Sequence, residues 1–187
     1  MENEDRDLIT AYVNGDEHAL AELIDRHTKS VYNFVYRLTD DPTRAEDITQ
    51  ETFIKAWKHL KTFRLEENFR TWIFTIARNT TIDHLRKKHT LPFSVLSKKN
   101  IDGDVLAFEE TLESLEPTPE EIAVLNEQKV FLERALFQIS ASSREVLLLR
   151  YNEDLTFDEI GKIVGKPLHT VKSQHRRALQ ELRKHLK

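Results

Sequence analysis

The sequence predicts an all-α protein with two helical domains joined by a flexible acidic linker. Only 4 Gly and 5 Pro occur among 187 residues, which favours long helices over a turn-rich β architecture. Apolar residues recur at helical spacing through most of the chain. This periodicity fails between about His89 and Thr118, where Ser, Pro, Asp and Glu accumulate. We therefore expect domains over residues 1–90 and 119–187, with residues 91–118 as the linker.

Three helical patterns fill the first domain. EHALAELIDRHTKSVYNFVYRL carries one apolar stripe, and Asp41 with Pro42 forms an N-cap and first-turn pair for DDPTRAEDITQETFIKAWKHL. After the break KTFRLEEN, a third helix is expected over FRTWIFTIARNTTIDHLRKK. The second helix has an inner face of Ala45, Ile48, Phe53, Ala56, Trp57 and Leu60, and an outer face of Glu46, Asp47, Gln50 and Glu51.

The third helix has two opposed arcs when residues are stepped by about 100°. Trp72 lies near the apolar arc, so we expect it in the core rather than on a base-stacking surface. The apolar arc holds Phe69, Ile73, Ile76 and Ala77, and the opposite arc holds Thr75, Arg78, Asn79 and Arg86.

The second domain begins with two helices, PEEIAVLNEQKVFLERALFQI and SASSREVLLLRYNE, and ends with a more specific pattern. Thr156 and Glu159 are spaced as a capping box for a short helix that ends at Gly165-Lys166-Pro167. A last helix follows, with Val171, Ala178, Leu182 and Leu186 on its inner side. Two helices joined by a short Gly-containing turn form a helix-turn-helix, whose second helix enters the DNA major groove.

The outer side of the last helix carries groups suited to DNA. Arg can pair with guanine through two hydrogen bonds, and Lys neutralises phosphate. A solvated basic face that complements the helix dipole is the alternative. His175 falls on the inner side, where a partly buried imidazole is expected rather than a DNA contact or metal ligand. The outward residues are His169, Ser173, Arg176, Arg177 and Gln180, flanked by Thr170 and Lys172.

Charge and composition limit the classes of function. The net charge is −4, divided as −2 in residues 1–90, −6 in 91–121 and +4 in 122–187. Without Cys, disulfides, thiolate catalysis and Cys-ligated zinc are excluded. The opening MENEDRDLITAY is acidic, so no signal peptide is expected, and no apolar run approaches the ~18 residues of a membrane span. A cytoplasmic protein is the simplest expectation.

Three blocks follow one another along the chain: AEDITQETFIKAW, FRTWIFTIARNTTIDHLRKK and REVLLLRYNEDLTFDEIGKIVGKPLHTVKSQHRRAL. In this order they resemble the bacterial RNA polymerase sigma factors of the extracytoplasmic-function (ECF) type. The resemblance implies that residues 1–90 are sigma region 2 and residues 119–187 sigma region 4. It implies core RNA polymerase, promoter DNA (duplex and single-stranded) and an anti-sigma factor as partners. No cofactor, no metal ion, no membrane insertion and no enzymatic activity are implied.

The resemblance also assigns roles to residues. Glu46, Asp47, Gln50 and Glu51 would dock on the clamp helices of the largest polymerase subunit. Phe63, Arg64 and Asn68 would hold an extruded base of the minus-ten element, while Thr75, Arg78, Asn79 and Arg86 follow the non-template strand. His169, Thr170, Lys172, Ser173, Arg176, Arg177 and Gln180 would read the minus-thirty-five duplex.

Some positions depart from the family pattern. His169, Gln174 and His175 stand where Gly, Arg and an apolar residue are common, and Ser140 stands where Pro often occurs. These departures leave the minus-thirty-five preference open. For the acidic linker two roles stay open, a nucleic-acid mimic inside the polymerase cleft and a solvated tether.

Two other classes of function are weaker. A conventional helix-turn-helix regulator would need a sensory or dimerisation domain in residues 1–90, where the polymerase-binding and melting blocks stand instead. An enzyme would need a Gly-rich phosphate loop, paired His at metal spacing or a nucleophile motif, and the sequence contains none of these.

Overall fold

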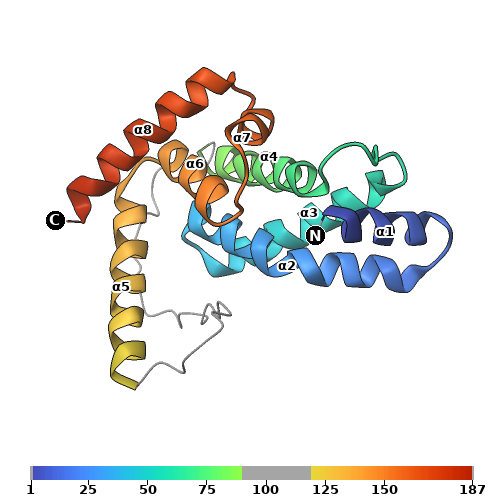
Figure 1. The fold of residues 1–187 in the computed structure, drawn as a ribbon, viewed down its shortest axis with the longest axis horizontal. Coiled ribbons are helices and arrows are strands. Elements are labelled where there is room, and N and C mark those ends of the chain that lie inside the picture. Colours follow the sequence, from blue (N-terminus) through green and yellow to red (C-terminus); the bar gives the residue numbers. More distant parts are fainter. Residues whose placement is uncertain (1, 90–118, 187) are drawn as a thin grey trace.

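The computed structural model describes residues 2–89 and 119–186, and every regular element in these ranges is an α-helix (Figure 1). The all-α class is therefore confirmed, while the predicted linker, residues 91–118, lies outside the described ranges. The helices are α1 (Glu2–Val13), α2 (Glu17–Thr39), α3 (Pro42–Leu60), α4 (Phe69–His89), α5 (Pro119–Gln138), α6 (Ala141–Tyr151), α7 (Phe157–Val164) and α8 (Leu168–His185).

Helix α1 is an element that the sequence analysis missed. Its Ile9 is buried in the core, and its Asp5 carboxylate lies 3.1 Å from Nε2 of His27 on α2, with both side chains buried. Arg26 of α2 adds an ion pair to Glu4 at 3.0 Å. The apolar residues Leu8, Ile9 and Tyr12 do have helical spacing, but the acidic residues around them hid this signal.

The first four helices pack around one apolar core. Asp41 caps α3 as predicted, because its side chain accepts a hydrogen bond from the Arg44 backbone N–H at 3.1 Å, with Pro42 in the first turn. Phe34 of α2 and Phe74 of α4 meet edge to face in the centre, with ring centroids 5.3 Å apart. Trp57 was predicted on the inner face of α3, but it is 51% exposed and donates from Nε1 to the Tyr12 hydroxyl at 2.8 Å. That prediction was wrong.

The C-terminal helices form the predicted helix-turn-helix. The Thr156 and Glu159 capping box is present at the start of α7, and Gly165 ends that helix with a left-handed φ of 67°. The predicted inner residues Val171, Ala178 and Leu182 of α8 are buried. Leu186 is not, because it follows the last turn of α8 and is 38% exposed.

The N- and C-terminal helices share one continuous core. Buried Ile73 and Phe74 of α4 belong to the same cluster as Val146 and Leu149 of α6 and Ile160 of α7. Figure 1 shows α7 lying beside α4, while α6 packs against α2 and α8, with α8 on the outer side. The packing of the two halves therefore decides which candidate residues can reach a partner.

Candidate nucleic-acid interface

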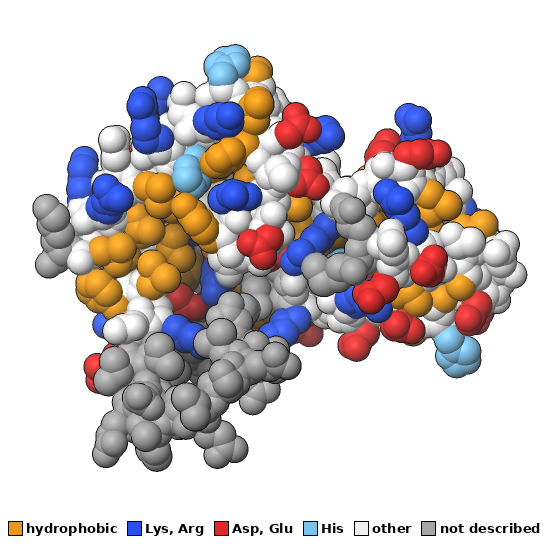
Figure 2. Space-filling model, in the orientation of Figure 1, with side chains coloured by type: hydrophobic (Ala, Val, Ile, Leu, Met, Phe, Trp, Pro, Cys, Tyr) orange, Lys and Arg blue, Asp and Glu red, His pale blue; other side chains and the backbone are white. Residues whose placement is uncertain are grey.

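Helix α8 presents a basic face to solvent. The turn before it spans Gly165, Lys166 and Pro167, so the helix starts at Leu168. Its apolar side lies against α6 and α7. Among the described residues, Lys172, Arg176 and Arg177 pair with no carboxylate, and Figure 2 shows Lys and Arg side chains spread along this edge of the molecule. Of the predicted set, His169, Lys172, Arg176, Arg177 and Gln180 are exposed, and Thr170 and Ser173 are half-buried.

Gln174 joins three segments of the C-terminal half. Its Oε1 accepts a hydrogen bond from Nζ of Lys166 at 2.7 Å, and its Nε2 donates to the Ser142 carbonyl oxygen at 2.5 Å. The side chain therefore ties α8 to the turn and to the start of α6. Such a contact with a distant backbone carbonyl gives no signal in the sequence.

His175 lies on the inner side of α8, as predicted. Its Nε2 is 3.2 Å from the Tyr151 hydroxyl, and its ring packs on Phe157 with centroids 5.0 Å apart. Burial, with a smaller contribution from the Arg150 charge, lowers the pKa of His175 below its ordinary value. The neutral imidazole therefore serves as a packing group between α8 and the start of α7.

The loop before α4 contains the three residues that were predicted to hold an extruded base, and their environments differ. Phe63 is half-buried, and its ring contacts Trp72 at 5.0 Å between centroids. The Arg64 side chain is 74% exposed. Asn68 caps α4, because its Oδ1 accepts from the Thr71 backbone N–H at 3.1 Å, while its Nδ2 donates to Glu159 of α7 at 3.1 Å. Arg64 is thus open to solvent, whereas Phe63 and Asn68 are engaged within the protein.

The polar arc of α4 is also divided. Asn79 and Arg86 are exposed, and the half-buried Thr75 donates its hydroxyl to the Thr71 carbonyl oxygen at 2.7 Å. Arg78 instead forms an ion pair across the two halves of the chain, with 2.5 Å between its Nε and Oε1 of Glu145. The polar arc therefore offers two exposed groups and one that α6 covers.

A second ion pair across the halves was missed by the sequence analysis. Nη2 of Arg70 lies 3.0 Å from Oε2 of Glu153. Glu153 is buried, and this desolvation, opposed by Arg70 and Arg37, raises its pKa to about 7. On the helical wheel Arg70 falls about 20° from buried Ala77, so spacing alone gave no sign of an acidic neighbour there.

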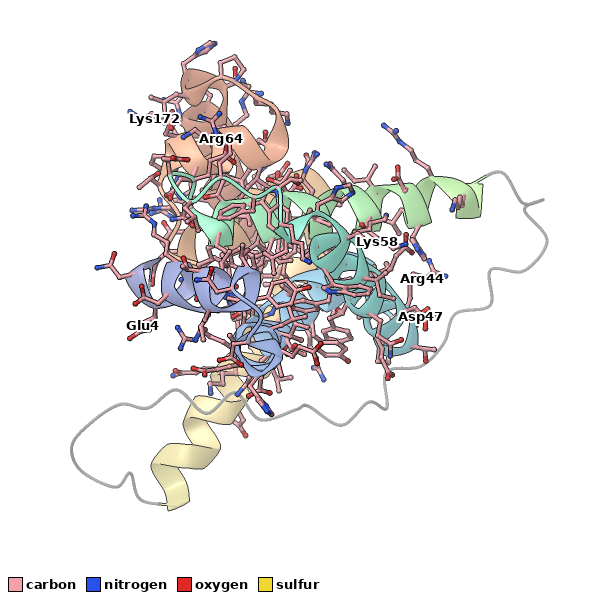
Figure 3. All side chains as sticks on the ribbon, turned by 90° about the vertical axis from the view of Figure 1, so that its right-hand side faces the viewer. Glu4, Arg44, Asp47, Lys58, Arg64 and Lys172 are labelled. Atoms are coloured by element: carbon pink, nitrogen blue, oxygen red, sulfur yellow. The ribbon has the colours of Figure 1, made fainter. Side chains whose placement is uncertain are left out.

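The acidic face of α3 lies elsewhere on the molecule. Glu46, Asp47 and Gln50 are exposed, and Figure 3 shows Asp47 well separated from Arg64 and Lys172. Glu51 differs, because it pairs with Lys55 at 2.8 Å and with His84 at 2.7 Å. Hydrogen bonds from Lys55 and His84 lower the pKa of Glu51 to about 2, and the bond from Lys55 has the larger effect. Three of the four predicted residues are thus exposed to solvent.

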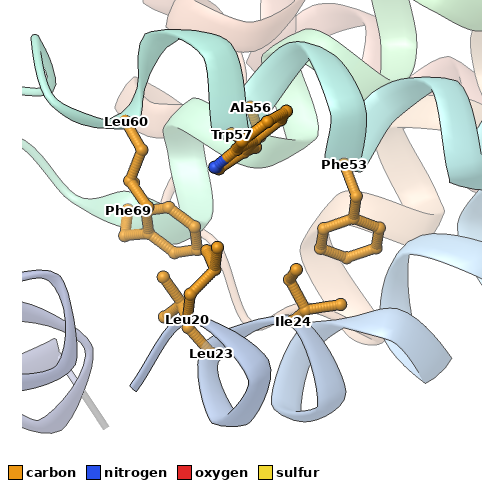
Figure 4. Close-up of a pocket in the computed structure, with 8 residues that line it drawn as sticks. All are labelled: Leu20, Leu23, Ile24, Phe53, Ala56, Trp57, Leu60 and Phe69. Carbon is orange, nitrogen blue, oxygen red and sulfur yellow. The ribbon is translucent and has the colours of Figure 1, made fainter. Parts of the chain in front are cut away.

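Exposed apolar residues accompany the acidic ones on α3. Ile54 is about as exposed as Trp57, and the sequence analysis assigned neither of them to a binding surface. Trp57 also borders an apolar pocket between α2 and α3 (Figure 4). The pocket is lined by Leu20, Leu23, Ile24, Phe53, Ala56, Trp57, Leu60 and Phe69, so it offers no charged group for catalysis.

Two kinds of feature are absent from the residues that the structure describes. No three His, Asp or Glu side chains in residues 2–89 and 119–186 gather closely enough to hold a metal ion. In the same part of the chain, no helix combines the length and apolar character needed to cross a membrane.

Comparison with known proteins matches both halves of the chain. Sigma-70 region 2 matches residues 23–90, and Sigma-70 region 4 matches residues 135–184. The ECF RNA polymerase sigma factor SigW of Bacillus subtilis (strain 168) is 32% identical over 173 residues, which cover 92% of this chain and 91% of SigW. The RNA polymerase sigma-H factor of Pseudomonas aeruginosa is 28% identical over 186 residues, covering 99% of this chain and 95% of the relative.

Two solved structures share the fold. CnrH in complex with the cytosolic domain of CnrY superposes with a TM-score of 0.68 at 23% identity, covering 98% of this chain and 97% of CnrH. The sigma factor RpoE in complex with the anti-sigma factor NepR from Bartonella quintana gives 0.64 at 22% identity, covering 89% and 95%.

Proposed function

Since the chain belongs to the ECF sigma factors of bacterial RNA polymerase, we propose that it binds core polymerase and the two promoter elements through separate surfaces. Residues 1–90 bind core polymerase and melt the minus-ten element. Residues 119–187 read the minus-thirty-five element, and residues 91–118 connect them.

The observation that carries this proposal is the exposed face of α8. Its Lys172, Arg176 and Arg177 project from a helix whose opposite side is held in the core. Such a helix can enter the major groove with Arg contacting base edges and Lys contacting phosphate. His169, Thr170, Ser173 and Gln180 complete the minus-thirty-five surface.

The minus-ten surface consists of the loop before α4 and the polar arc of that helix. Arg64, Asn79 and Arg86 are exposed and suited to the backbone of a single strand. The surface also includes Phe63, Asn68, Thr75 and Arg78. Those whose side chains contact other parts of the protein must first leave these contacts.

Core polymerase docks on the outer face of α3. Glu46, Asp47 and Gln50 supply exposed polar groups, and Ile54 and Trp57 add apolar area beside them. Glu51 contributes mainly by holding Lys55 and His84, because its carboxylate is already paired with both.

The chain itself performs no chemistry in this proposal, since RNA synthesis belongs to the polymerase, and it acts in the cytoplasm, where the polymerase is. We also propose regulation by an anti-sigma factor. This rests on the relatives of similar fold, of which RpoE was solved bound to the anti-sigma factor NepR. A regulator with an N-terminal sensory domain is not favoured, because Sigma-70 region 2 matches residues 23–90.

Genome-wide run-off transcription with the purified chain and core polymerase tests the proposal. We expect transcripts that start downstream of one shared pair of promoter elements. An Arg176→Ala/Arg177→Ala variant should still co-elute with core polymerase but lose these transcripts. A chain that fails to bind core polymerase, binds duplex DNA alone and blocks initiation would be a regulator instead.

A further inference from the structure

Helices α6 and α7 and the segment between them place three carboxylates against α4 and the loop before it, and two of the residues they contact, Asn68 and Arg78, belong to the proposed minus-ten surface. Glu145 pairs with Arg78, Glu153 pairs with Arg70, and Glu159 accepts a hydrogen bond from Asn68. The distances are 2.5, 3.0 and 3.1 Å. Each contact joins a carboxylate of the C-terminal half to a donor of the N-terminal half.

Two of these carboxylates are removed from water. The side chains of Glu145 and Glu153 are 8% and 5% exposed, and their Arg partners are largely covered as well. Burying such charges is costly unless each one is paired with good geometry. The surface on α4 is therefore complementary to anions, and Arg binds carboxylate and phosphate oxygens through the same donors.

Contacts around the ion pairs hold the two halves together. Arg144 of α6 reaches across to the Arg37 carbonyl oxygen at 2.6 Å, and Arg37 pairs with Glu133 of α5 at 3.4 Å. The apolar core also continues from α4 into α6 and α7. The carboxylates are thus presented by a packed interface rather than by a chance contact of surface side chains.

We propose that Asn68, Arg70 and Arg78 form one phosphate-binding surface, which the carboxylates Glu145, Glu153 and Glu159 occupy in the free protein. The single-stranded minus-ten DNA and the C-terminal half then compete for the same donors. Arg70 becomes a further DNA-binding residue, and the C-terminal half becomes an intramolecular inhibitor of the N-terminal one. This inference rests on the proposed function of α4.

A distance measurement tests whether these carboxylates keep the halves together. The chain has no Cys, so Lys58→Cys and Arg183→Cys, both at exposed sites, accept a donor and an acceptor dye in the full-length protein. At pH 8, where Glu153 is ionised, Glu145→Gln/Glu153→Gln leaves two largely covered Arg without counter-charges, and we expect a lower energy-transfer efficiency. The control Glu127→Gln/Asp158→Asn removes the same charge at exposed positions and should match the unmutated pair.

A binding measurement tests the competition. The probe is a fluorescein-labelled single-stranded DNA of about 12 nucleotides and mixed sequence, titrated at several salt concentrations. Relative to the control, Glu145→Gln/Glu153→Gln should bind about tenfold more tightly, because the competent fraction rises. Because Arg70 and Arg78 become available to the DNA, the slope of log affinity against log salt concentration should steepen by about 1.4.

The outcomes separate this inference from the proposed function. Unchanged energy transfer in Glu145→Gln/Glu153→Gln overturns the inhibitory contact. Lower energy transfer combined with DNA binding that is insensitive to an added Arg70→Ala overturns the phosphate-binding surface.

A second set of variants guards against misfolding. If circular dichroism shows that Glu145→Gln/Glu153→Gln has lost its helices, the exchange Arg78→Glu/Glu145→Arg replaces it. Each single change should then lower the energy transfer and the double change should restore it. A double change that fails to restore it overturns the pairing.

Discussion

The cations on α8 differ in what they can read from DNA. Arg177 carries a planar fork that can bind a guanine edge through two hydrogen bonds, whereas Lys172 is a point charge suited to phosphate. Both are exposed, and neither pairs with a carboxylate among the described residues. Their substitutions should therefore affect binding in different ways.

Arg177→Ala should relax the preference at one position of the minus-thirty-five element, with a loss of ~1–3 kcal/mol for the preferred base. Lys172→Ala should weaken binding to all sequences and reduce the salt slope by about 1. Selection of binding sites from a randomised duplex, followed by salt titration, measures both. Identical selected sequences for Arg177→Ala and the unmutated chain would remove Arg177 from the reading surface.

Gln174 should matter for stability. Gln174→Ala removes hydrogen bonds to Lys166 and to the Ser142 carbonyl, and we expect a loss of about 1 kcal/mol in the free energy of unfolding. Urea unfolding measures the change. His169→Ala is the matched control, because it removes an exposed side chain from the same helix. Equal midpoints for the two variants would show that the bridge does not stabilise the fold.

At the scale of elements, the helix-turn-helix depends on a close approach between α7 and the turn. A Cβ on Gly161 would lie 2.8 Å from the Lys166 carbonyl oxygen, which is closer than such atoms can pack. The Lys166 backbone N–H also donates to the Gly161 carbonyl at 3.0 Å, so the turn cannot move away without losing this bond. The angle between α7 and α8 is therefore set by the absence of a side chain.

Gly161→Ala should lower the free energy of unfolding by ~1–3 kcal/mol and weaken duplex binding, because the overlap moves α8. Thermal unfolding and binding to the selected minus-thirty-five duplex measure the two effects. Lys162→Ala is the control, since its side chain is exposed on the same helix. A Gly161→Ala variant as stable as Lys162→Ala would mean that the turn absorbs the extra methyl group.

Local signals predicted the elements well. The Asp41-Pro42 start of α3 and the Thr156/Glu159 box were confirmed, because a cap depends on residues that are neighbours in the sequence. Helix α1 was missed because its apolar residues are few and its anchor, His27, lies on another helix. Trp57 was misplaced because periodicity shows which face is apolar but not how wide the buried part of that face is.

At the scale of the whole molecule, pairing between the two halves could not be predicted. Arg78 and Glu145 are 67 residues apart, and Arg70 and Glu153 are 83 apart. The sequence placed Arg78 correctly on a polar arc, but nothing in the spacing shows which segment covers that arc. The family resemblance assigned its role with polymerase and DNA, whereas the structure shows its contacts in the free chain.

The buried Glu153 should make stability depend on pH. Its pKa is about 7 in the folded protein against an ordinary 4.5, so folding favours the protonated form. The resulting stability is complete below about pH 4.5 and is lost as the pH rises to about 7. Arg70, Arg37 and Asp154 are the charged groups that act on it.

Urea unfolding between pH 5 and 8 isolates this contribution when it is compared with Glu153→Gln, which is neutral at every pH. Each unit of pKa shift corresponds to about 1.4 kcal/mol. The unmutated chain should therefore lose more stability than Glu153→Gln over this range. Parallel pH profiles would show that Glu153 keeps an ordinary pKa in the folded state.

The long separation between the paired residues has a consequence during protein synthesis. The ribosome adds about 5–20 residues per second, so Glu145 follows Arg78 by roughly 3 to 13 seconds. Through that interval the N-terminal helices can fold while the Arg70 and Arg78 side chains still lack their carboxylates. We therefore expect a stage in which the proposed phosphate-binding surface of the nascent chain is uncovered, and synthesis of α6 and α7 ends that stage.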